Sequence, residues 1–119
     1  MSTLVCFDPD AVRRLVDDDE DLAFARSFVA CYLKLLPQRV RRVAQALDGD
    51  DLDDTRDAVL SLTVSAATVG ALELAELGRD LDRLVCEGDR VRAITAAIAL
   101  TEVADRVASS LEEFLASWS

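Results

Sequence analysis

Apolar residues recur at intervals of three and four along most of the chain, and this spacing limits the fold more than any other feature. One such stripe consists of Ala25, Val29, Tyr32, Leu36, Val40, Val43 and Leu47. Because an α-helix repeats about every 3.6 residues, this stripe forms one apolar face of a helix of roughly seven turns. The 119 residues include only four Gly and two Pro, which favours helices over a turn-rich sheet. The sequence therefore predicts an all-α protein.

Capping residues predict where the first two helices begin. Asp8 is a good N-cap and Pro9 suits the first helical position, so we expect a short helix that ends near Val16. The acidic run 17–21 then begins the long second helix, because the helix dipole favours carboxylates at an N-terminus. Pro37 lies inside this second helix and removes one backbone hydrogen bond, which predicts a kink rather than a break.

Three more helices are predicted, each with its own apolar stripe. The third runs from about 52 to 69, with the expected core residues Leu52, Val59, Leu62, Ala66 and Val69. Gly70 ends it, and the fourth helix stops at Gly88 and buries Leu74, Leu77, Leu81 and Leu84. The fifth begins at Asp89 and buries Ile94, Ala97, Leu100, Val107, Leu111, Phe114 and Trp118.

Short connections determine how these helices are expected to pack. The segment 48–50 both ends the second helix and caps the third, so only a few residues separate one helix from the next. Connections this short force neighbouring helices to run antiparallel. We therefore expect a single domain over residues 1–119, with a core from about 7 to 115. Its predicted architecture is an up-down antiparallel four-helix bundle with a short extra N-terminal helix.

Charge and cysteine usage narrow the classes of partner and compartment. The formal net charge of −10 disfavours nucleic acids and anionic membranes, because both require a basic protein face. The chain has an odd number of cysteines, Cys6, Cys31 and Cys86, and none of them forms a C-x-x-C pair. This pattern is typical of free thiols in a reducing compartment. The sequence shows neither a signal-peptide pattern nor an apolar run long enough to span a bilayer. A soluble, cytoplasmic protein is therefore predicted.

The sequence does not assemble a metal or catalytic site. The acidic segment that starts at Asp48 fails as a calcium loop, because Asp53 stands where that loop requires Gly and Val59 where it requires Glu. The chain contains no His, so neither the thiols nor the hydroxyls have a neighbouring base to activate them. The hydroxyls in question are Ser61, Thr63, Ser65 and Thr68. We therefore expect no metal, no cofactor and no enzymatic activity.

Small and apolar residues in the third and fourth helices follow a specific order. The stretch 58–74 reads AVLSLTVSAATVGALEL and resembles the signature of histidine-phosphotransfer (HPt) domains. The third helix of that family reads roughly A-H-x-L-K-G-S-A-x-x-x-G, and the next helix carries L-x-x-L-E. The residues that match in register are Leu62, Ser65, Ala66, Gly70, Ala71, Leu74 and the Leu81-Asp82 pair, with Asp in place of Glu.

The resemblance extends from about Phe7 to Leu115. Outside the signature, the matching segments are Phe7-Asp-Pro-Asp, Phe28, Leu36-Pro37 and Ala46-Leu-Asp-Gly-Asp50. It implies an HPt-like four-helix bundle that belongs to bacterial two-component signalling, in which phosphorelays pass a phosphoryl group between proteins.

Three departures from the family remove its chemistry. In this register Leu60 occupies the phosphoacceptor position of the family's His, Thr63 stands in place of Lys, and Val64 in place of Gly. The imidazole nitrogen is the nucleophile that carries the phosphoryl group, and leucine has no such group. The resemblance therefore implies a pseudo-HPt protein that binds partners of the pathway without transferring phosphate.

The outward face of the third helix is the predicted docking surface. At about 100° per residue, the residues opposite its core stripe are Arg56, Leu60, Thr63, Val64 and Ala67. In the HPt family this face is exposed and docks a receiver domain. We expect an apolar strip here, because contiguous exposed apolar area marks interfaces. The implied partner is a response-regulator receiver domain or the dimerisation domain of a sensor kinase.

Alternatives to this docking hypothesis remain open at the level of sequence. Leu60 is also consistent with simple drift after loss of the histidine, since single exposed leucines are common. The strip equally suits a homodimer seam in a structural or scaffold protein. The basic cluster Arg39, Arg41 and Arg42 is interpreted as a solvated face of the second helix that also suits an acidic partner.

Overall fold

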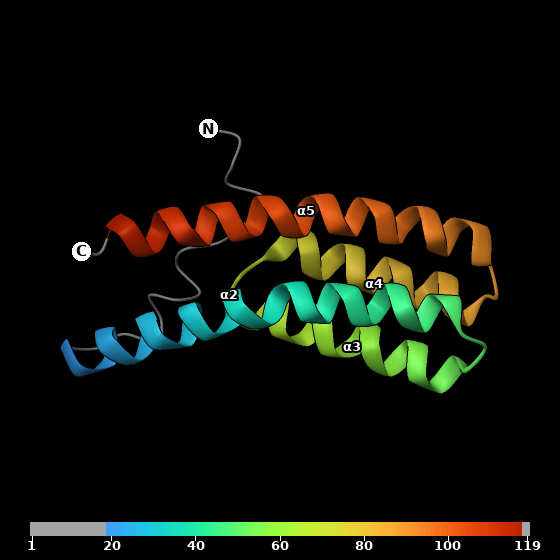
Figure 1. The fold of residues 1–119 in the computed structure, drawn as a ribbon, viewed down its shortest axis with the longest axis horizontal. Helices are drawn as coiled ribbons and strands as arrows, with labels where there is room; N and C mark the ends of the chain where they lie inside the picture. The colour runs from blue at the N-terminus through green and yellow to red at the C-terminus, as the bar shows by residue number, and fades with distance from the viewer. Residues whose placement is uncertain (1–18, 118–119) are drawn as a thin grey trace.

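The computed structural model describes residues 19–117, and their side chains from residue 23 onward. The helices are α2 (Asp19–Asp48), α3 (Leu52–Thr68), α4 (Leu72–Cys86) and α5 (Arg90–Ser117), as Figure 1 shows. Helices and short turns account for all of these residues, and the described range contains no strand. The predicted all-α class is therefore confirmed. The short helix predicted for residues 8–16, the side chains of the acidic run 17–21 and Trp118 lie outside the described residues.

Capping residues set the ends of the helices, although the cap of α3 lies one residue after the predicted segment 48–50. Asp51 caps α3, because its carboxylate accepts a hydrogen bond from the Asp54 N–H at 3.1 Å. Gly70 follows α3 with φ of 82°, and Gly88 follows α4 with φ of 75°. Such positive φ values favour glycine at a helix C-terminus. α2 continues through Pro37 without a break.

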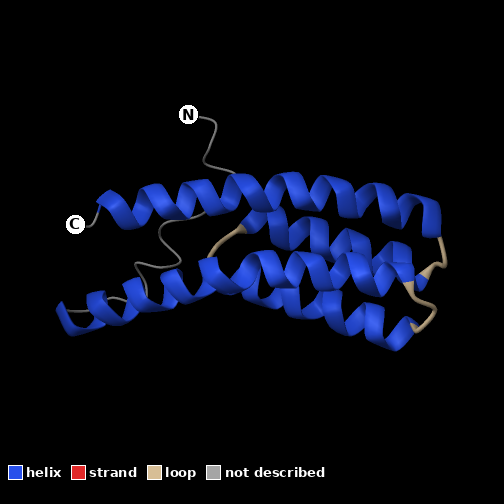
Figure 2. Ribbon diagram, in the orientation of Figure 1, coloured by secondary structure: helices blue, strands red, loops and turns tan. Residues whose placement is uncertain are grey.

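The four helices pack in a ring in which α2 and α4 each contact both α3 and α5. Figure 2 shows the α2–α3 and α4–α5 turns at one end of the molecule and the α3–α4 turn away from that end. The apolar faces of all four helices meet in one core. Its largest fully buried side chains include Leu36, Leu62, Leu74, Leu81, Leu100 and Leu111.

Two residues that periodicity assigns to the core are exposed, and these predictions are wrong. Leu52 is 52% exposed, because it is the first residue of α3 and lies at the end of the helix. Ile94 is 43% exposed and lies with Val91 and Ile98 on an outward stripe of α5. That helix carries apolar residues on more than one face, so spacing alone did not identify which face is buried.

Helices α3 and α4 approach each other closely at Gly78, a buried residue in the middle of α4. A Cβ atom added at Gly78 would collide with the Thr63 hydroxyl and would lie 3.1 Å from the Thr63 Cβ. The hydroxyl is itself held in place, since it donates a hydrogen bond to the Val59 carbonyl at 2.8 Å. The packing of α3 on α4 therefore requires glycine at position 78.

Gly78→Ala is expected to lower the free energy of unfolding by about 1–3 kcal/mol through overpacking. A loss of stability would identify a steric clash, because alanine in an open helix position is about 1 kcal/mol more favourable than glycine and would stabilise the protein. Urea unfolding measures the change. Gly49→Ala is the matched control, since its added Cβ would lie in ordinary contact with the Ala46 carbonyl, at 3.5 Å. Adding Thr63→Ala should restore part of the loss, and a Gly78→Ala variant as stable as the wild type would contradict the close approach.

Candidate functional site

Helix α3 presents an apolar strip on its outer surface. Leu60 is 44% exposed and Val64 is 62% exposed, and Ala67 is also exposed. Because residues three and four apart are neighbours on a helix surface, these side chains form one continuous row. We call Leu60, Val64 and Ala67 the α3 strip. The sequence alone did not establish that the first two are exposed.

Of the other two predicted residues of this face, Thr63 is buried, whereas Arg56 is partly exposed and pairs with a carboxylate of α4. Thr63 is only 7% exposed and faces Gly78 of α4, so the prediction that it lies on the outer face is wrong. Arg56 is half-buried and binds Asp82 of α4, with its Nε donating to Oδ1 at 3.0 Å and its Nη2 to Oδ2 at 3.3 Å. This hydrogen-bonded ion pair raises the pKa of Arg56. Arg56 therefore links α3 to α4.

The serine and threonine hydroxyls beside the strip bond to their own helix. Ser65 donates to the Ser61 carbonyl at 2.8 Å, and Thr68 donates to the Val64 carbonyl at 2.9 Å. Such bonds to the carbonyl four residues earlier are common for hydroxyl side chains inside helices.

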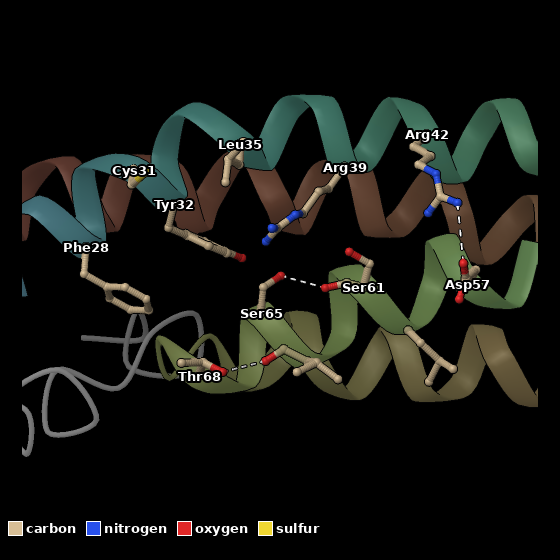
Figure 3. Close-up of a pocket in the computed structure, with 12 residues that line it drawn as sticks. Phe28, Cys31, Tyr32, Leu35, Arg39, Arg42, Asp57, Ser61, Ser65 and Thr68 are labelled. Carbon is tan, nitrogen blue, oxygen red and sulfur yellow. Dashed lines mark hydrogen bonds and ion pairs between the residues drawn. The ribbon is translucent and has the colours of Figure 1, made fainter.

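A groove of about 690 Å³ lies between α2 and α3 (Figure 3), and Leu60 and Val64 of the strip form part of one wall. Its apolar lining comes from Phe28, Leu35, Leu60 and Val64. Its polar lining includes Tyr32 and Arg39 from α2 and Ser61 and Ser65 from α3. The sequence did not reveal this groove, because helical periodicity gives the faces of each helix but not the space between two helices.

Tyr32 carries the least satisfied polar group of the groove. The side chain is only 4% exposed, and its hydroxyl has no hydrogen-bond partner in the described part of the chain. Burial raises the Tyr32 pKa to about 12, and the nearby Arg39 guanidinium opposes part of this rise. A buried hydroxyl without a partner destabilises a fold by about 1–3 kcal/mol. Tyr32 is therefore held as a neutral donor without an acceptor.

The single tyrosine of the chain makes this burial measurable. In the folded protein, tyrosinate absorbance should appear near pH 12, whereas in denaturant it should appear near pH 10, the ordinary value. The unfolded state loses the phenol proton first, so the stability gained from the neutral phenol is lost as pH rises from 10 towards 12. The total loss should be about 2–3 kcal/mol. Ionisation near pH 10 before unfolding would contradict a buried hydroxyl.

The cluster Arg39, Arg41 and Arg42 is not a uniformly solvated face of α2, because Arg39 is half-buried whereas the other two are exposed. Arg42 pairs with Asp54 of α3 at 3.2 Å and lies 4.0 Å from Asp57. Arg41 is exposed. Arg39 is half-buried and lines the groove, and Figure 3 shows its guanidinium and the Tyr32 hydroxyl pointing toward one another above Ser65.

Within residues 19–117, no group of three or more His, Cys, Asp or Glu side chains is placed to hold a metal ion. None of the helices α2 to α5 is both long and apolar enough to cross a membrane. Cys31 and Cys86 are exposed free thiols. Comparisons with protein-family models, curated proteins and solved structures find no match to this chain.

Proposed function

We propose that this protein is a non-phosphorylatable HPt-like module that acts by binding alone in two-component signalling. It docks a response-regulator receiver domain or a sensor-kinase dimerisation domain through the α3 strip. The observation that carries the proposal is the exposure of Leu60 and Val64, at 44% and 62%. These are the positions where the sequence resemblance places the phosphoacceptor histidine and its neighbouring glycine. A cytoplasmic location follows from the proposed partners.

The fold supports the proposal through the way its helices are connected. Short turns between consecutive helices and the ring of contacts among α2, α3, α4 and α5 fit the up-down antiparallel bundle of an HPt-like domain. The face that would meet a partner is then the α3 strip together with the side of α2 across the groove. Because buried apolar area drives association, the strip would contribute binding energy that an exposed histidine would not.

Binding without group transfer follows from the residues of the strip. The chain has no His, and Leu60 has neither a nucleophilic atom nor a proton acceptor. The hydroxyls of Thr63, Ser65 and Thr68 on the same helix donate to helix carbonyls. A partner that docks here meets the shape of a phosphotransfer domain but no phosphoryl acceptor, so the protein competes with true phosphotransfer partners.

Calorimetric titration against receiver domains and kinase dimerisation domains from the same genome tests this function. We expect saturable binding to at least one of them, and no radiolabelled phosphate on this chain after incubation with the phosphorylated partner. Labelling of this chain, or no binding to any such domain, would contradict the proposal. A mass that rises with concentration in sedimentation, and falls again in Leu60→Asp, would instead support a homodimeric scaffold.

A further inference from the structure

The groove between α2 and α3 contains an unpaired cation beside an unpaired hydroxyl. Of the cationic residues between 23 and 117, Arg39 is the half-buried one that has no carboxylate partner. Arg56, the other half-buried cation of this range, is paired with Asp82. The Tyr32 hydroxyl beside Arg39 also has no hydrogen-bond partner among the described residues. Both groups are donors, so together they lack an acceptor oxygen.

We propose that this groove binds an amphipathic carboxylic acid, with its carboxylate between the Tyr32 hydroxyl and the Arg39 guanidinium. The apolar body of the ligand lies against Phe28, Leu35 and Val64, which line the same groove. A carboxylate accepts a charge-assisted hydrogen bond from a guanidinium and a second bond from a phenol hydroxyl. The ligand therefore satisfies both donors at once. This inference goes beyond the proposed function and does not depend on it.

The chemistry of the groove favours a carboxylate over a more highly charged anion. The chain has a net charge of −10, so its overall field repels polyanions such as nucleotides. Asp57 also lines the groove, where it lies 4.0 Å from Arg42. A single negative charge at the Tyr32–Arg39 end meets the least repulsion. Tyr32 remains a donor at neutral pH, because burial raises its pKa to about 12.

The size and lining of the groove favour a ligand with a substantial apolar part. Its volume of about 690 Å³ lies within the range of small-molecule sites, which are typically apolar with a few placed polar groups. Phe28, Leu35, Leu60 and Val64 provide the apolar lining. A small acid such as acetate would bond to the two donors but leave this lining exposed to water.

Decanoate is the probe for this site, used below its micelle concentration in calorimetric titrations of the full chain. We expect saturable binding of decanoate, and binding of decanol and of acetate weaker by about tenfold or more. The first comparison removes the charge and the second removes the apolar body. Equal affinity for decanol and decanoate, or no saturable binding of decanoate, would overturn the proposal.

Matched variants test the two donors. Arg39→Gln should weaken decanoate binding by about tenfold or more, and Tyr32→Phe should weaken it several-fold. Arg41→Gln removes the same charge from an exposed position on the same helix and should leave the affinity unchanged. Tyr32→Phe keeps the ring in the core, so thermal unfolding should show an intact fold. Loss of affinity in Arg41→Gln equal to that in Arg39→Gln would overturn the proposed contact.

Native cysteines locate the bound ligand. Cys31 lines the groove, whereas Cys86 lies at the end of α4 and outside it. In a Cys6→Ser background, decanoate should slow the alkylation of Cys31 and leave that of Cys86 unchanged. Equal protection of both thiols would place the ligand elsewhere and overturn the assignment. These assays need no partner protein, so failure of partner docking and failure of this site are distinguishable.

Discussion

Leu62→Ala should lower the free energy of unfolding by about 2–5 kcal/mol, whereas Leu60→Ala should lower it by about 1 kcal/mol or less. The two leucines lie two positions apart on α3, so they differ in environment and not in side chain or helix. Leu62 is fully buried in the core, at 0% exposure, while Leu60 is 44% exposed. Truncating a packed side chain removes buried apolar surface and leaves a cavity. Truncating a partly exposed side chain removes less buried surface and leaves a smaller cavity or none.

Urea unfolding followed by circular dichroism measures both changes. The dependence of stability on urea should stay the same in the two variants, since neither substitution alters the surface exposed on unfolding by much. Losses of equal size would show that Leu60 belongs to the core. In that case α3 would have no apolar strip available to a partner, and the proposed docking surface would be wrong.

Periodicity predicted most of the buried face in the region of α3, but it wrongly included Leu52, which is exposed. Val59, Leu62, Ala66 and Val69 are all essentially inaccessible to solvent, as their spacing predicts. The prediction works for these four residues because their spacing of three and four places them on one face of a helix. It fails for Ile94, because α5 carries apolar side chains on more than one face and the sequence does not rank them.

The burial of Thr63 could not be predicted from its position on a helical wheel. Its angular position places it outside the apolar stripe of α3, yet it is buried because Gly78 allows α4 to approach it closely. The buried arc of a helix depends on the size of the residues on its neighbour, and the neighbour has to be known first. Gly78, a glycine inside a helical stretch, is the sequence signal from which this close approach could have been predicted.

The groove was equally beyond sequence reasoning. Tyr32 belongs to the predicted core stripe of α2, and its burial is confirmed. The missing partner of its hydroxyl and the inward direction of Arg39 follow from where α3 lies relative to α2. Arg42 pairs with Asp54 across the same boundary, whereas Arg39 has no carboxylate partner among the described residues. The two arginines differ in pairing because of where they lie in the fold, which residue type does not reveal.

Replacing Leu60 by Asp is expected to weaken partner binding by about thirtyfold or more. A carboxylate at this position would have to be desolvated against an apolar partner surface, and that surface would lose its apolar contact. The fold should be unaffected, because Leu60 already contacts solvent. Val64→Asp, at a position one turn away and 62% exposed, should have a similar effect.

The most direct test compares Leu60→Asp with Ile98→Asp by calorimetric titration against the receiver or kinase domain that the wild-type protein binds. Ile98 is a matched control, since it is 61% exposed and lies on α5, so the same change of charge occurs away from the strip. We predict that Leu60→Asp loses measurable binding while Ile98→Asp keeps the wild-type affinity. Unchanged binding in Leu60→Asp, or equal loss in both variants, would contradict docking through the α3 strip.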